Sequence, residues 1–136
     1  MKKTLIFFLV ALFVASCDDS NKDLKMKVID LTVKSSDWIE SIDKDSLNRY
    51  YSCHFSMPEI NSAVYNNGSV LSYILINNAQ QVLPYVRHYE DVYGALWTRT
   101  VDFDYALGGM NFYVTNSDFA VDQPIAMDFR VVLMWP

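Results

Sequence analysis

The sequence predicts an all-β domain, an antiparallel β-sandwich or a small barrel of about seven strands with one short helix. Two observations carry this prediction. Short segments in which apolar and polar residues alternate recur after residue 24, and a period of two is typical of strands with one face against a core. Turn-forming residues, such as Gly108 and Gly109, separate these segments at the spacing expected of hairpins.

The alternation predicts seven strands. They are expected over residues 25–34, 49–55, 70–76, 82–89 and 97–105, in a segment that begins at residue 110, and over residues 129–135. Residues 70–76 are apolar on both faces, which places that strand in the middle of a sheet. Pro84 cannot donate to a strand ladder, so the strand over residues 82–89 is expected at an edge or with a bulge. The polar segment 40–48 and the segment 77–81 are expected to be loops.

One short helix is expected over residues 58–66. Residues 56–59 have the form of a capping box, with Pro58 in the first turn, where a missing N–H costs nothing. Gly68 would end the helix in a left-handed conformation.

The first 16 residues have the pattern of a bacterial signal peptide. Two lysines precede residues 4–14, an apolar run that is too short to cross a bilayer as a permanent helix. The small residues Ala15 and Ser16 then stand directly before Cys17. This arrangement resembles the lipobox of bacterial lipoproteins. The resemblance implies that diacylglycerol is attached to the Cys17 thiol, that the chain is cleaved before this residue, and that the new amino terminus is acylated.

Residues 17–24 are polar and are expected to form a short acidic tether to a single domain over residues 25–136. Asp18 and Asp19, directly after the cysteine, resemble either an inner-membrane retention signal of enterobacteria or the surface-export signal of Bacteroidota lipoproteins. The second suits the rest of the chain, so we expect a lipid-anchored protein of the outer membrane at the cell surface. The alternatives to a lipoprotein leader are an uncleaved anchor and an ordinary secretory leader that ends near a cysteine.

Composition narrows the set of partners. Removal of residues 1–16 leaves 120 residues, which is enough for one hydrophobic core. The leader contains two of the 11 basic residues and none of the 16 acidic ones, so the mature chain carries a net charge of −7. An acidic chain without a basic stripe binds nucleic acid poorly, so we expect no nucleic-acid partner. Anionic lipid would also repel it, so membrane attachment has to come from the acyl chains.

The second cysteine and the two histidines give no sign of a catalytic site. Cys53 shares one face of its strand with Tyr51 and Phe55, so we expect a buried thiol, with a reactive nucleophile as the alternative. His54 and His88 have no partner at the spacing of metal ligands, and we expect both on solvent faces of strands.

Two pairs of carboxylates stand at alternate positions, as in calcium loops. Neither Asp43 with Asp45 nor Asp102 with Asp104 has the glycine and the distant glutamate of an EF-hand loop, so we expect no metal and no cofactor. As a glycosidase pair, the same carboxylates would need a cleft that raises one pKa. We therefore expect a protein that is not an enzyme, and a small glycan-acting enzyme is the alternative.

The segment from Pro84 to Trp97 carries the best indication of a binding site. Its tyrosines offer flat apolar faces, and the arginine and histidine between them offer hydrogen-bond donors, the combination used to hold sugars or a partner protein. The candidate contacts are Tyr85, Arg87, His88, Tyr89, Tyr93 and Trp97, with Trp38 as a second candidate. The alternative is that half of these aromatic residues fill the core, and that Trp38 is a lid on it.

Several short motifs recur in an order that resembles a group of small Bacteroidota lipoproteins of unassigned function. They are Ser36-Asp37-Trp38, Pro58-Glu59-Ile60, Gly68-Ser69-Val70-Leu71-Ser72-Tyr73, Leu83-Pro84-Tyr85 and Arg130-Val131-Val132-Leu133. The resemblance supports the cell-surface interpretation and implies no active site. We therefore expect a binding or accessory protein whose partner is a glycan or another envelope protein. A purely structural envelope lipoprotein is a further alternative.

Overall fold

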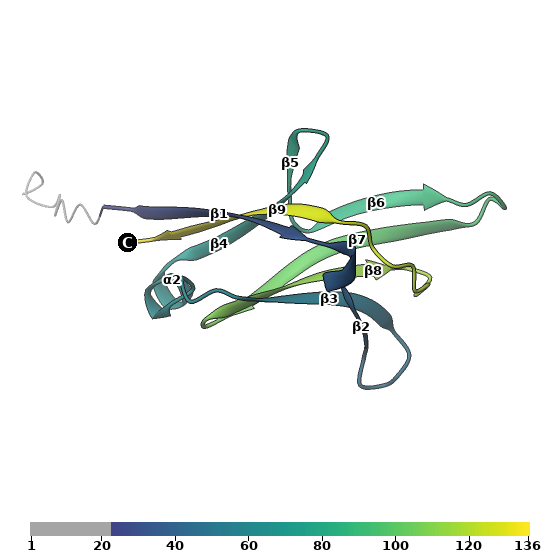
Figure 1. Cartoon of the computed structure of the whole chain (residues 1–136), viewed down its shortest axis with the longest axis horizontal. Helices are drawn as coiled ribbons and strands as arrows, with labels where there is room; N and C mark the ends of the chain where they lie inside the picture. The colour runs from purple at the N-terminus through teal and green to yellow at the C-terminus, as the bar shows by residue number, and fades with distance from the viewer. Residues whose placement is uncertain (1–22) are drawn as a thin grey trace, which may run out of the picture.

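The computed structural model describes residues 23–136 (Figure 1). These residues form nine strands, one short α-helix and one turn of 3-10 helix. None of their helices is both long enough and apolar enough to pass through a lipid bilayer. The predicted leader, the lipidation site Cys17 and residues 17–22 of the predicted tether lie outside the described residues.

The strands form two antiparallel sheets. They are β1 (Lys25–Val33), β2 (Ile39–Ile42), β3 (Arg49–Ser56), β4 (Ser69–Ile76), β5 (Ala79–Val82), β6 (Tyr85–Glu90), β7 (Leu96–Ala106), β8 (Gly109–Asn116) and β9 (Met127–Trp135), with η1 (Ser35–Asp37) and α2 (Ser62–Asn67) between them. A four-stranded sheet has the order β1-β9-β4-β5, and a five-stranded sheet has the order β2-β3-β8-β7-β6. The prediction of an antiparallel all-β sandwich is confirmed, and within residues 23–136 no ladder closes the two sheets into a barrel.

The core lies between the two sheets. Phe112 on β8 stacks on Phe129 on β9 with ring centroids 4.1 Å apart, so this pair joins one sheet to the other. Neither phenylalanine has exposed surface. Cys53 pairs with Phe112 across β3 and β8 and is buried, whereas its neighbour His54 is exposed. The strand register predicted from alternation at Cys53 is therefore confirmed.

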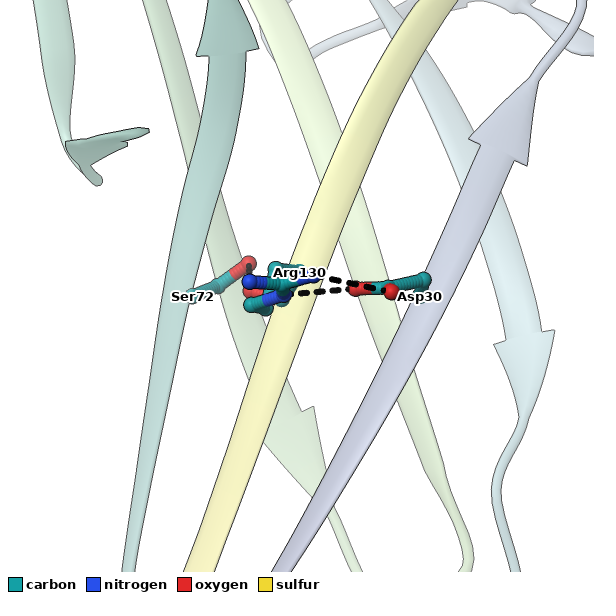
Figure 2. A network of polar contacts seen from close by, with 3 residues as sticks. All are labelled: Asp30, Ser72 and Arg130. Atoms are coloured by element: carbon teal, nitrogen blue, oxygen red, sulfur yellow. Dashed lines mark hydrogen bonds and ion pairs between the residues drawn. The ribbon is translucent and has the colours of Figure 1, made fainter. Parts of the chain in front are cut away.

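Arg130 ties together three neighbouring strands of the four-stranded sheet (Figure 2). Its Nε donates to Oδ1 of Asp30 on β1 at 2.7 Å, and its Nη2 donates to Oδ2 at 3.0 Å. These hydrogen bonds, together with the charge of the guanidinium, hold the pKa of the Asp30 carboxyl below its usual value. On the other side, the Ser72 hydroxyl on β4 donates to the Arg130 carbonyl at 3.4 Å, which satisfies a polar group without exposed surface.

The helix differs from the prediction at both ends. It begins after Asn61, whose side-chain oxygen accepts hydrogen bonds from two backbone N–H groups of the first turn. The predicted capping box is wrong because the Glu59 carboxylate pairs with Lys27 on β1 at 2.9 Å. Gly68 has a φ of −116°, so the predicted left-handed end is also wrong. A Cβ at this position would collide with the carbonyl oxygen of Met134, so glycine allows the helix to end against β9.

Three expectations for residues 40–109 are wrong in part. The predicted loop over residues 40–48 contains most of β2, which pairs with β3 at the edge of the five-stranded sheet. The strand β4 lies inside its sheet as predicted, but it is buried on one face only, since Leu71 on the other face is 37% exposed. The two-residue turn before β8 consists of Leu107 and Gly108, because Ala106 pairs with Gly109.

The predicted strand over residues 82–89 is divided between the two sheets. Asn77 and Asn78 both have positive φ and close a tight turn, so β5 begins at Ala79 within the predicted loop. The chain then passes through Pro84 and continues as β6 in the opposite sheet. The prediction that the strand with the candidate contacts lies at an edge is confirmed for β6.

Candidate functional site

The β6–β7 hairpin carries most of the residues predicted to contact a ligand, and it extends past the other strands in Figure 1. The ladder between β7 and β8 begins at Arg99, and the Ser117 backbone N–H also donates to the Thr98 carbonyl at 2.8 Å, so Leu96 and Trp97 are the residues of β7 that pair with β6 alone. Because β8 does not continue along this part of β7, side chains near the hairpin tip are free of the packing that fills the core.

One face of this hairpin carries three successive cross-strand pairs. They are Tyr85 with Val101, Arg87 with Arg99, and Tyr89 with Trp97. Val101 is 1% exposed and belongs to the core, so alternation turns all three pairs toward the four-stranded sheet. The structure therefore brings together four of the predicted contacts, Tyr85, Arg87, Tyr89 and Trp97, and adds Arg99 to them.

The outermost pair forms an aromatic platform. The rings of Tyr89 and Trp97 are stacked, with centroids 4.4 Å apart and planes inclined by 14°. The Arg99 guanidinium carbon lies 5.3 Å from the Trp97 ring centroid and 6.0 Å from that of Tyr89, which is cation–π distance. Arg99 Nε also donates to Oδ1 of the buried Asn116 at 3.0 Å. These contacts hold the arginine and the platform in place before a ligand arrives.

A cleft of about 460 Å³ lies beside this face. Its lining residues come from the hairpin, from the end of β4 and from the start of β9 with the residues before it. They are Ile74, Leu75, Ile76, Asn77, Tyr85, Arg87, Tyr89, Arg99, Val101, Ile125, Ala126, Met127 and Asp128. The volume falls in the range of small-molecule sites, and an apolar wall with a few convergent polar groups is typical of them.

One wall of the cleft is the end of the segment from residue 117 to residue 126, and hydrogen bonds anchor this wall from behind. The Ser35 hydroxyl donates to the Pro124 carbonyl at 2.7 Å, and the Gln123 amide donates to the Ser35 carbonyl. The Trp38 indole Nε1 donates to the Ile125 carbonyl at 3.3 Å. The segment around η1 therefore fixes the position of Ile125 at the cleft.

Trp38 itself is a core residue. It is 4% exposed, and its ring meets that of Phe129 edge-on, with centroids 6.4 Å apart. Its interpretation as an exposed ligand contact is wrong, and the alternative, a lid on the core, describes its position.

Two further candidates lie away from the cleft. His88 is on the opposite face of β6, where its Nδ1 is 3.0 Å from the Thr98 hydroxyl. Tyr93 stands at the hairpin tip and is 92% exposed. Sequence reasoning missed Arg99, although Arg99 shares the alternating face of Trp97 and Val101, and this parity could have identified it.

A second polar cluster lies on the outer face of the five-stranded sheet. Asp104 accepts hydrogen bonds from the Asn111 amide at 2.7 Å and from the Tyr113 hydroxyl at 2.8 Å, and Asn111 Oδ1 lies 2.8 Å from His54 Nδ1. Burial, followed by the hydrogen bond to Asp104, raises the pKa of Tyr113 to about 12. Burial and the charge of Asp104 also raise the pKa of Asp102. Because Asp104 is exposed on an open sheet face, this cluster lacks the enclosure that a glycosidase pair requires.

The other acidic pair, in the loop between β2 and β3, orders its own loop. Asp43 accepts a hydrogen bond from the Asn48 amide at 2.9 Å, and Asp45 accepts one from the Leu47 backbone N–H at 3.1 Å. Across residues 23–136, no three His, Cys, Asp or Glu side chains gather as a metal site would require.

A larger hollow of about 830 Å³ lies at the other end of the sandwich, beside α2. It is lined by Asp23, Lys25, Ala63, Asn67 and Pro136, at the point where the described part of the chain begins. This lining contributes no aromatic side chain, whereas the cleft at the hairpin joins aromatic faces to hydrogen-bond donors. The cleft is therefore the better candidate for a ligand site.

Comparisons of the chain with protein-family models, with curated proteins and with solved structures found no match. The chemistry of the cleft is therefore the guide to function. Two guanidinium groups, two tyrosines and an apolar wall are suited to binding and orienting a ligand.

Proposed function

We propose that this chain is a lipid-anchored, non-enzymatic binding protein of the bacterial cell surface that holds a glycan in the cleft beside the β6–β7 hairpin. The observation that carries the proposal is the stacked pair of Tyr89 and Trp97 with arginines beside it. A sugar ring has a flat C–H face that packs on aromatic rings, and its hydroxyls accept hydrogen bonds from guanidinium groups. Placement at the outer membrane is supported by the sequence around Cys17.

The binding proposal is tested on a glycan array with the full-length chain, purified in a mild detergent. An aromatic anchor contributes about 2 kcal/mol, so Tyr89→Ala should weaken binding to the recognised glycan roughly thirtyfold. The melting temperature should stay nearly unchanged because Tyr89 is 38% exposed.

Tyr65→Ala is the matched control for this substitution. Tyr65 is a tyrosine of similar exposure, 47%, and it lies on α2 away from the hairpin, so its loss should leave glycan binding intact. The proposal fails if the chain binds no glycan on the array, or if Tyr89→Ala and Tyr65→Ala bind equally well.

The lipid anchor is tested by Cys17→Ala. Without acyl chains, the polar residues after this position offer nothing that inserts into a bilayer, so the variant should lose palmitate label and leave the membrane fraction. Undiminished label and membrane-bound protein would refute the lipidation proposal, whatever the outcome for glycan binding.

A partner protein is the second candidate, and the hairpin tip favours it. Val92, Tyr93 and Leu96 are 94%, 92% and 80% exposed, and exposed apolar side chains that lie together often mark a protein contact. A photo-crosslinking amino acid at position 93 in living cells should then link to one envelope protein, and Leu96→Ser should remove that link. The absence of any crosslink would exclude this function for the tip.

A further inference from the structure

We propose that the cleft selects an acidic glycan and that Arg87 and Arg99 bind the carboxylate of a hexuronate-type sugar. This inference rests on the proposed function, and it adds the chemical class of the ligand. The inference follows from the positive charges of the two arginines beside the platform, because aromatic stacking of a neutral sugar would not require them.

The two arginines lie opposite each other, and no carboxylate among the described residues pairs with their positive charges. Arg87 and Arg99 are directly opposite on antiparallel strands, where like charges destabilise the pairing. The other two arginines of the chain each pair with a carboxylate on the neighbouring strand, Arg49 with Glu40 at 2.8 Å and Arg130 with Asp30 at 2.7 Å. Within residues 23–136, neither cleft arginine has a carboxylate oxygen within 4.0 Å.

This lack of compensation does not reflect a shortage of carboxylates. The chain has 16 acidic and 11 basic residues, and three of the acidic ones lie in the cleft lining or at the hairpin tip. Asp128 lines the cleft, but its Oδ1 accepts a hydrogen bond from the Thr32 hydroxyl at 2.6 Å. Asp91 accepts the backbone N–H groups of the hairpin turn, and alternation places Glu90 on the opposite face of β6. The lining of the cleft therefore keeps a net charge of +1, from two guanidinium groups and one carboxylate, and this charge is left for a ligand.

The guanidinium groups are also free to donate. Arg99 uses Nε to hold the buried Asn116, which leaves its two terminal nitrogens without a partner among the described residues. Arg87 is exposed and makes no side-chain hydrogen bond within residues 23–136. A guanidinium fork matches the two oxygens of a carboxylate, and such charge-assisted bonds are stronger than bonds to neutral hydroxyls.

A hexuronate satisfies both features of the site with a single residue. Its pyranose ring has a C–H face for the Tyr89 ring, the member of the aromatic pair that lines the cleft, and its carboxylate projects from the edge of the same sugar ring. The arginine pair is the next cross-strand pair inward from the aromatic pair, about 7 Å along the strands. One sugar residue can therefore stack on Tyr89 and reach the arginines with its carboxylate.

The test is isothermal titration of the full-length chain in detergent with tetrasaccharides of galacturonate, glucuronate and mannuronate, each beside its methyl ester. The ester keeps the ring and removes the charge. The affinity for at least one uronate should exceed the affinity for its ester by about tenfold or more. Raising the salt concentration should weaken the binding of that uronate. Arg87→Gln should lower the affinity for the uronate about tenfold and leave the affinity for the ester unchanged.

Arg49→Gln is the matched control, because it removes the same charge outside the cleft and should bind uronates like the parent chain. If the parent chain binds uronate and ester equally and Tyr89→Ala loses both, the selection of an acidic glycan is refuted and the glycan-binding proposal stands. If a sulfated tetrasaccharide of otherwise neutral sugars binds more tightly than every uronate, the assignment of the ligand group to a carboxylate is refuted. If no saccharide binds, the inference and the proposed function both fail. If Arg87→Gln and Arg49→Gln bind uronate with equal affinity, the inference alone fails.

Discussion

Trp38 connects the core to the wall of the cleft, and two substitutions there separate these roles. Trp38→Ala removes a buried indole that packs against Phe129, which should cost about 3–5 kcal/mol of unfolding free energy. That is a large share of the roughly 5–15 kcal/mol that stabilises a domain. Trp38→Phe keeps a ring in the core and removes the hydrogen bond from Nε1 to the Ile125 carbonyl at 3.3 Å. Water can reach Ile125, which is 74% exposed, so this change should cost only about 1–2 kcal/mol.

Urea unfolding followed by circular dichroism measures both costs without relying on the fluorescence of the removed indole. Amide hydrogen exchange should rise across residues 123–127 in Trp38→Phe, because one anchor of the cleft wall is gone while the sandwich stays folded. Equal costs for the two variants, or a cost below about 1 kcal/mol for Trp38→Ala, would refute the core position of the indole. Unchanged exchange in Trp38→Phe would show that its hydrogen bond does not hold the wall.

Two further predictions concern buried titratable groups. Cys53 is 7% exposed and burial raises the pKa of its thiol, so a bulky maleimide should label it only after denaturant is added, and rapid labelling of the native chain would contradict its inward register. Burial and Asp104 raise the pKa of the Asp102 carboxyl above its ordinary 3.8, so folding disfavours the charged form and Asp102→Asn should raise the melting temperature at neutral pH. That gain should shrink as the pH falls through the folded-state pKa and vanish below the ordinary value, where the carboxyl is protonated in both states. Thermal melts from pH 3 to pH 7 measure it, and a gain that persists at pH 3 would contradict the reasoning.

Local patterns predicted the strands that are long enough to show a period of two. Six strands have eight or more residues, and Cys53 on β3 illustrates how alternation also determines which side chains turn inward. The two missed strands, β2 and β5, have four residues each and lie at sheet edges, where the period is too short to recognise. The start of α2 was misplaced because Ser56 and Asn61 both offer a cap, and the ion pair from Glu59 to Lys27 is a long-range contact that no local pattern contains.

Residues of the candidate site were also grouped correctly where the signal is local and misjudged where it depends on distant contacts. Tyr85, Arg87, Tyr89 and Trp97 were predicted because they lie in one continuous segment rich in tyrosine. Trp38 was misjudged because its neighbours are polar in sequence, whereas the partner that buries it, Phe129, lies 91 residues further along the chain. Such partners are set by the packing of one sheet on the other.

The cleft itself follows from unequal strand lengths within one sheet. β7 has 11 residues and β8 has eight, so β6 and the first residues of β7 continue past the end of β8. The row of side chains that faces inward is buried at Val101 and becomes accessible toward the hairpin tip, where Tyr89 and Arg99 line the cleft and Trp97 stacks on Tyr89. The chain supplies the missing wall from residues 117–126, held by Asn116 on one side and by Trp38 on the other. Shortening the hairpin by its two outermost cross-strand pairs would remove the aromatic platform and leave the arginine pair at the edge of the core, where nothing would orient a sugar ring against it.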